Sequence, residues 1–405
     1  MSLKHLAGLA LAAGLFALPL QAETPQPNPA DWPAVLAEAR GQTVYWNAWG
    51  GSTTTNDFIA WIGERAAADY GVTLTHVKLS NTADAVARVL SEQQAGLTQG
   101  GAVDLIWING PNFAAMKEAG LLFGPFAEDL PNWQLVDIAG KPVQADFTVP
   151  TEGMESPWAT AQVVFMYDSA DMAPLPDMRA LLDWARANLG RFTYPQPPDF
   201  LGTTFLKQVL YEVVADPSVL LAPVDQADYA TVTAPLWAYI EALTPHLWRQ
   251  GRAYPETGTR QLQLLADDEV ALAISFSPGE ASAAIANGQL PASVRTFVPA
   301  GGSIGNASFV AIPFNASAKA GAMVIANLLL SPQAQARALD PAYLGYGTVL
   351  GMARLSPEDR ARFDQIDLGI ATLAPDQLGA ALPEPHPSWM VQIEADWIAR
   401  FGGGK

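Results

Sequence analysis

Short apolar runs alternate with longer amphipathic segments along the first third of the chain. Strand-like runs occupy residues 43–46, 72–79 and 103–108, and helix-like segments follow them at residues 58–70, 82–96 and 112–122. Gly71, between the first helical segment and the second strand, is typical of a helix C-cap. This alternation predicts an α/β architecture with a largely parallel sheet.

The pattern changes near residue 157 and then resumes. "WATAQVVFMYD" at residues 158–168 is a long β-rich run, and helix-like and strand-like segments alternate again as far as residue 282. "SFVAIPFNA" at residues 308–316 predicts another strand, and "VPAGGSIGNASF" at residues 298–309 predicts the loop before it. We therefore expect two α/β halves, and no repeat of fixed period is visible.

Polar and aromatic residues gather where strands lead into helices. In open α/β sheets, ligands bind beyond the carboxyl ends of the strands. Free N–H groups of a helix start suit an anionic or carbonyl group, and an indole ring suits a flat or cationic one. The structural alternative is a capped helix with core tryptophans. The candidates in "WNAWGGSTTTND" and "WINGPNF" are Trp49, Gly51, Ser52, Thr53, Asn109 and Asn112.

Two junctions in the second half repeat this chemistry. "FTYPQPPDFLGTTF" at residues 192–205 and "AISFSPGEAS" at residues 273–282 each place small, hydroxyl and aromatic residues between an apolar run and a helix. From these we take Tyr194, Phe200, Thr203, Ser277 and Gly279 as candidate ligand-binding residues.

The N-terminal residues predict a secretory signal peptide. Lys4 precedes an apolar run at residues 6–20, and small Ala22 stands where signal peptidase would cut. The run is too short for a convincing membrane span. We therefore expect a signal peptide at residues 1–22 and a periplasmic mature protein. The chain has no cysteine, so it has no disulfide and no lipoprotein anchor.

Charge and missing motifs limit the function classes. The formal net charge is -18, which argues against nucleic acid or an anionic membrane as a partner. The chain has no nucleophile elbow, zinc-protease motif, P-loop or cysteine nucleophile, so we expect no catalytic residues. A secreted glycosidase-like hydrolase with two carboxylates meeting in a cleft stays open as an alternative, as does a lectin-like surface protein.

The order of the segments resembles that of family 1 extracellular solute-binding proteins, the periplasmic components of ATP-binding-cassette importers. The resemblance rests on "GAVDLIWINGPNFAAMKEAGLL", "ANLLLSPQAQARAL" and "PSWMVQIEADW", in that order. "WNAWGG" and "WINGPNF" are similar, more narrowly, to the YnjB-like branch, grouped near polyamine, thiamine and ferric-iron binders. The iron binders carry two adjacent tyrosines, whereas Tyr343 and Tyr346 are separated here. We therefore expect no metal and no cofactor.

The resemblance implies a two-lobed periplasmic-binding-protein fold (type II), in which each lobe is a mixed β-sheet flanked by helices. It implies crossing hinge strands and closure around a ligand in the cleft. Lobe 1 is expected at residues 23–160 plus roughly 306–345, and lobe 2 at residues 161–305 plus roughly 346–405. Family position adds five candidate ligand-binding residues, namely Glu155, Trp158, Gln162, Tyr346 and Trp389.

The expected function is capture of a small polar solute and its delivery to a membrane permease, by a protein that we expect to be monomeric. The aromatic loops and acidic composition favour an organic cation such as thiamine or a polyamine. A carbonyl or anionic group at the helix starts is nearly as well supported.

Overall fold

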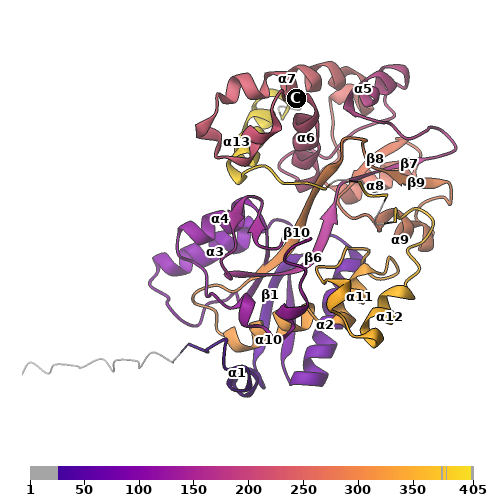
Figure 1. Cartoon of the computed structure of the whole chain (residues 1–405). Helices are drawn as coiled ribbons and strands as arrows, with labels where there is room; N and C mark the ends of the chain where they lie inside the picture. Colours follow the sequence, from indigo (N-terminus) through magenta and orange to yellow (C-terminus); the bar gives the residue numbers. More distant parts are fainter. Residues whose placement is uncertain (1–25, 375–376, 380, 403–405) are drawn as a thin grey trace, which may run out of the picture.

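The computed structural model describes residues 26–374, 377–379 and 381–402. Within this part of the chain two lobes lie one above the other, joined by long strands (Figure 1). The expected signal peptide at residues 1–22 lies outside the described residues. No helix in the described ranges is long and apolar enough to cross a membrane.

Lobe 1 is built on a mixed sheet. The strand order β2–β1–β3–β10 has three parallel strands followed by an antiparallel one, and β6 pairs with β10 on its other side. These strands are β1 (Thr43–Trp49), β2 (Thr73–Leu79), β3 (Leu105–Ile108), β6 (Glu155–Gln162) and β10 (Ser303–Ala311).

Seven α-helices of the described residues belong to lobe 1, and every residue of α10 is buried. They are α1 (Trp32–Ala39), α2 (Thr53–Tyr70), α3 (Ala83–Gln94), α4 (Pro111–Glu118), α10 (Lys319–Leu329), α11 (Pro332–Leu339) and α12 (Pro357–Asp364). A short hairpin, β4 (Ala145–Asp146) and β5 (Val149–Pro150), also belongs to this part of the chain.

Lobe 2 has a smaller antiparallel sheet in the order β8–β7–β9. Its strands are β7 (Val164–Asp168), β8 (Leu272–Ser275) and β9 (Val294–Phe297). The helices around it are α5 (Met178–Ala187), α6 (Phe200–Val213), α7 (Tyr229–Leu243), α8 (Gly258–Ala266), α9 (Glu280–Ala286) and α13 (Pro387–Phe401).

Two strand segments run between the lobes, and the chain crosses again between α12 and α13. β6 passes through Val163 into β7, whose pairing partners are all in lobe 2. β10 enters from the lobe 2 side, where its first residues pair with β11 (Ala381–Leu382), and ends paired with β3 in lobe 1. Figure 1 shows β6 and β10 as long strands bridging the lobes. The predicted two-lobed α/β fold with crossing strands is confirmed.

Several predicted element bounds need correction. The single strand predicted at residues 158–168 is two strands, because it breaks at Val163 where the chain changes sheets. β10 begins at Ser303, inside the segment predicted as a loop. α2 begins at Thr53 with Ser52 as its N-cap, so the hydroxyl residues form its first turn. Its predicted end is confirmed, since Gly71 is the C-cap with φ 68°.

The described packing bears on the lobe boundaries, which stay a prediction. The lobe 1 core cluster includes Val349, Leu350, Leu355 and Phe363, although we expected residues from 346 onward to belong to lobe 2. Because these side chains share the lobe 1 core, we propose that lobe 1 extends at least to residue 363.

Trp158 on β6 lies at the centre of an aromatic cluster in lobe 1. Its ring centroid is 4.9 Å from that of Trp107, 5.9 Å from that of Phe58 and 6.1 Å from that of Tyr346. Only 1% of Trp158 is exposed. The cluster therefore ties the crossing strand to α2 and β3 through apolar burial.

We predict that Trp158→Ala lowers the free energy of unfolding by about 3–5 kcal/mol, because it removes a large buried side chain and leaves a cavity. Chemical denaturation followed by far-UV circular dichroism measures this. Trp49→Ala is the control, since Trp49 is only partly buried, and we expect a smaller loss. A loss below about 1 kcal/mol for Trp158→Ala would contradict the packing account.

Candidate functional site

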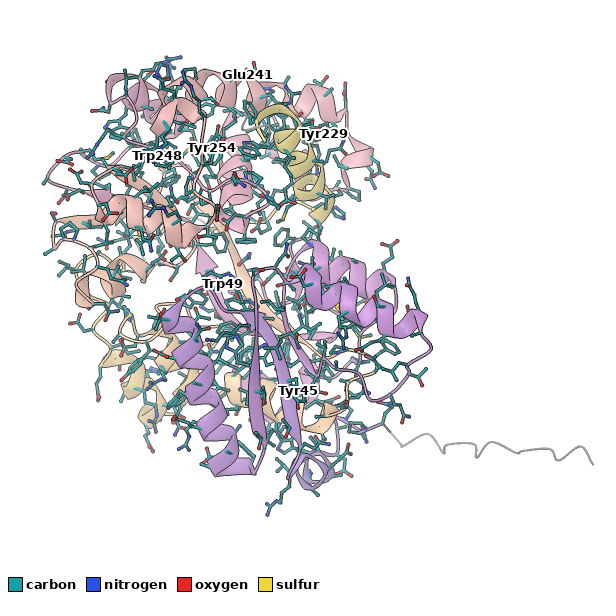
Figure 2. All side chains as sticks on the ribbon, turned by 180° about the vertical axis from the view of Figure 1, so that it is seen from behind. Tyr45, Trp49, Tyr229, Glu241, Trp248 and Tyr254 are labelled. Carbon is teal, nitrogen blue, oxygen red and sulfur yellow. The ribbon has the colours of Figure 1, made fainter. Side chains whose placement is uncertain are left out.

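The first strand-end loop lies between the lobes. Figure 2 shows Trp49 at the end of β1 nearest lobe 2, with Tyr45 farther down the strand. The Trp49 ring folds back over Gly51, where an added Cβ would lie 2.4 Å from the ring. The carbonyl of Gly51 accepts a hydrogen bond from Thr259 Oγ1 of α8, at 3.4 Å. This predicted loop therefore contacts the opposite lobe.

The second strand-end loop is held by a carboxylate from the β4–β5 hairpin. The Gly110 N–H donates to Asp146 Oδ2 at 2.6 Å, and Asn109 Nδ2 donates to Asp146 Oδ1 at 3.4 Å. Asn109 Nδ2 also donates to the Ala307 carbonyl of β10 at 2.7 Å. Asn109 thus links the loop to a crossing strand.

An internal ammonium group lies beside this loop. Lys207 of α6 is fully buried, and its Nζ donates to Glu384 Oε2 at 2.5 Å. The same Nζ is 4.7 Å from the ring centroid of Phe147 and 5.2 Å from that of Phe200. Phe147 follows β4 in lobe 1, whereas Phe200 begins α6 in lobe 2, so aromatic rings from both lobes face one cation.

A crossing strand completes this group. Asn306 of β10 donates through Nδ2 to Glu384 Oε1 at 3.1 Å. Across the same boundary α13 of lobe 2 contacts α4 of lobe 1, and Figure 1 shows the two helices facing each other. We call this group the junction cluster: Asn109, Asp146, Phe147, Phe200, Lys207, Asn306 and Glu384.

The junction cluster has more carboxylate than cation. Burial raises the pKa of Asp146 to about 8, against the lowering effect of the hydrogen bonds from Gly110 and Asn109. Glu384 adds to the rise, and Lys207 opposes it. Burial also raises the pKa of Glu384 and of nearby Glu394, and Lys207 opposes both shifts. Because the two carboxyl groups of the cluster and the neighbouring Glu394 share the charge of one ammonium, an added cation would be stabilised there.

The lobes also meet at two glycines. Ser277 Oγ donates to the Gly345 carbonyl at 3.1 Å, and the Gly279 N–H donates to the same oxygen at 3.1 Å. Gly279 precedes α9 in lobe 2, while the neighbours of Gly345, Leu344 and Tyr346, pack with the lobe 1 core. The two backbones can approach this closely because neither residue has a Cβ.

Comparison with known proteins identifies the family. Residues 61–359 match the model of the bacterial extracellular solute-binding proteins. The chain is also 44% identical over 374 residues to protein YnjB of Escherichia coli strain K12, covering 92% of this chain and 94% of YnjB. The chain belongs to the bacterial extracellular solute-binding family.

Solved structures agree on the fold. The spermidine/putrescine substrate-binding protein PotD of Streptococcus pneumoniae superposes with a TM-score of 0.58 at 16% identity, covering 90% of this chain and 99% of PotD. The periplasmic binding protein AfuA of Actinobacillus pleuropneumoniae, with fructose-6-phosphate bound, gives 0.61 at 13% identity, covering 89% and 99%. Proteins of this fold are thus named for different solutes, so the fold alone does not identify the ligand of this protein.

Family membership settles the class of function. The protein is an extracellular solute-binding protein, a member of a non-enzymatic family. The hydrolase alternative is therefore not retained.

Five of the predicted ligand-binding residues are almost entirely buried within a single lobe. Tyr194 accepts from Trp397 Nε1 at 3.0 Å within the lobe 2 core, and Trp389 stacks on Tyr229. Thr203 Oγ1 donates to Glu394 at 2.8 Å. Trp158 belongs to the lobe 1 core. Neither carboxylate oxygen of Glu155 has a described hydrogen-bond partner, and burial raises its pKa well above the ordinary value. Packing and internal hydrogen bonds account for the first four of these residues but not for the buried carboxyl group of Glu155, and the ligand roles of all five stay predictions.

The other candidates lie at or near the junction. Gln162 Nε2 donates to Ser303 Oγ at 3.1 Å, joining the two crossing strands. Ser52 caps α2, and Thr53 starts it. Asn112 is partly buried in the first turn of α4, and Tyr346 packs against Trp107 and Trp158. Their contacts with a ligand stay predictions.

Sequence reasoning missed most of the junction cluster. Lys207 carried a weak signal, since it is a lone lysine in a helix whose residues 202–211 are all buried. Glu384 stands between two prolines with no motif around it, and Phe147 has φ 55° in a short hairpin connection. Residues so far apart in sequence come together only through the fold.

We predict that Gly279→Ala separates the lobes. An added Cβ would lie 2.6 Å from the Gly345 Cα and 2.8 Å from its carbonyl oxygen, so the two backbones must move apart. Small-angle X-ray scattering should give a larger radius of gyration with little change in far-UV circular dichroism. Gly301→Ala is the control, because nothing lies within 4 Å of its added Cβ. An identical radius of gyration in both variants and the wild type would contradict the contact.

Proposed function

We propose that the protein captures a small organic cation, such as a polyamine or thiamine, between its lobes and presents it to the permease. The single observation that carries the proposal is the charge of the junction cluster. Lys207 is already held there by a carboxylate and by two aromatic faces, which is the chemistry that recognises an alkylammonium group.

The carboxyl groups near Lys207 outnumber its single positive charge, so their charge can stabilise a second cation. Asp146, Glu384 and Glu394 each have a pKa raised by burial, and Lys207 is the shared opposing charge. A ligand cation beside the cluster would lower the pKa of Asp146 and favour its ionised form. Binding near neutral pH would therefore release a proton.

The helix starts at the junction offer less to an anion. The first turn of α2 is capped by Ser52, that of α6 by Asp199, and the Gly110 N–H before α4 donates to Asp146. Since side chains of the protein already accept from these donors, a ligand anion would have to displace them. This favours the cation over the anionic alternative.

Maturation and assembly belong to the same proposal. We propose that the chain is secreted with cleavage near Ala22 and acts in the periplasm as a monomer. The family's extracellular role supports secretion, and a single two-lobed chain is sufficient to enclose a small solute.

The test is calorimetric titration of protein that has been unfolded and refolded to remove bound solute. We predict that spermidine, putrescine or thiamine binds and that fructose 6-phosphate does not. Binding at pH 7.5 should release protons, which makes the measured enthalpy depend on the ionisation enthalpy of the buffer. Asp146→Asn should weaken binding by about tenfold or more.

Asp129→Asn is the matched control, because Asp129 is an exposed carboxylate of lobe 1 outside the junction cluster. It should bind with wild-type affinity. Tight binding of fructose 6-phosphate with no response to any cation would overturn the proposal. If Asp146→Asn binds the cation with wild-type affinity, the junction cluster is not the cation site.

A further inference from the structure

A concavity lies on lobe 1, outside the junction cluster. Its volume is about 420 Å³, and it is lined by residues of α2, α11 and α12 and of the segments that follow α11 and α12. All of these elements pack in lobe 1, so the concavity does not depend on how the lobes are placed. Its wall includes three arginines, Arg65, Arg337 and Arg362.

Arg337 is held between two aromatic rings. Its guanidinium carbon is 3.6 Å from the ring centroid of Tyr343 and 4.8 Å from that of Trp61. Contacts with two rings restrict the orientation of the planar group. Because its Nε is buried, a ligand would have to be bound by the terminal Nη atoms.

The charge of Arg337 has no described counterion. Within the described ranges it makes no ion pair, and its Nε is buried without a hydrogen-bond partner. The flanking arginines differ, because Arg65 pairs with Asp69 at 2.5 Å and Arg362 pairs with Asp359 at 3.3 Å. The concavity thus has one guanidinium without a described ion pair and two that are paired with carboxylates.

The lining of the concavity is richer in cations than the chain as a whole. The formal net charge of the protein is -18, yet three arginines and one carboxylate, Asp340, line this wall. Asp69, Glu358 and Asp359 pair with Arg65 and Arg362, and Asp340 Oδ1 already accepts from the Ala342 N–H at 2.8 Å. The attraction for an anion is therefore local to Arg337.

We propose that this concavity is a binding site for a small oxyanion, gripped by the edge of Arg337 and flanked by Arg65 and Arg362. Carboxylate and phosphate groups share the required chemistry, because both present two oxygens to a guanidinium edge. The exposed Tyr343 ring and the Trp61 ring form apolar walls beside the anion. The site is separate from the cation site proposed between the lobes.

The experiment is calorimetric titration of the full-length mature protein with inorganic phosphate and, separately, with citrate, at constant ionic strength maintained with sodium chloride. Wild-type protein should bind at least one of the two with saturation at one site. Phosphate binding alone would assign a phosphate group, and citrate binding alone a carboxylate group. Binding of both would assign the shared oxyanion chemistry.

Two variants separate a built site from general charge attraction. Arg337→Lys keeps the charge but loses the planar edge, and should weaken binding by about tenfold or more. Arg362→Gln leaves the aromatic stacking untouched and should also weaken binding. Arg179→Ala is the control, since Arg179 is an exposed arginine of α5 in lobe 2, and it should bind as the wild type does.

The melting temperature of each variant is measured alongside, because Arg337 also packs between two rings. If Arg337→Lys lowers the melting temperature while phosphate and citrate bind with wild-type affinity, the stacking is structural and the proposal is wrong. Absence of saturable binding of both anions to the wild type overturns it as well. Equal loss of binding in Arg179→Ala would show attraction by net charge only, which also overturns it.

Discussion

The buried ammonium of Lys207 is the constraint on which the lobe junction depends. A charged group with no exposed surface has to be paired, and here the pairing comes from Glu384, with Phe147 and Phe200 over the same atom. Phe147 belongs to the β4–β5 hairpin of lobe 1, Lys207 to α6 of lobe 2, and Glu384 to the segment before α13. These three segments must therefore lie together for the buried charge to be stabilised. Asn306 ties these segments to a crossing strand.

The crossing strands give this junction its geometry. β6 and β10 pair with each other over most of their length, and β10 also pairs with β3 in lobe 1 and with β11. We therefore expect a change in the lobe angle to occur where the two strands leave their common ladder, near Gln162 and Ser303. The close approach of Gly279 and Gly345 lies elsewhere between the lobes. Contacts of this kind, small and mostly polar, are compatible with a protein that must open and close around a solute.

Much of the fold could be predicted from the sequence, because apolar periodicity and helix caps are local signals. The alternation up to residue 122 and the Gly71 cap were confirmed by the structure. The bounds of β6, β7 and β10 could not be predicted, since the break at Val163 depends on which sheet each half joins. The site was partly predictable for the same reason. The loops at Gly51, Asn109 and Gly279 carry turn and polar signals, whereas the partnership of Asp146, Lys207 and Glu384 exists only after folding.

The central claim is that the carboxyl group of Asp146 at the junction is buried without enough nearby positive charge to keep it ionised at neutral pH. The most direct test is to follow the side-chain carboxyl carbon of Asp146 by ¹³C nuclear magnetic resonance from pH 4 to pH 9, in ligand-free protein, with its signal assigned by its loss in Asp146→Asn. The account predicts a midpoint near pH 8, because burial raises the pKa of Asp146 to about 8. A midpoint near the ordinary value of 3.8, with the group ionised throughout, would mean that the junction is already neutralised and would contradict the account.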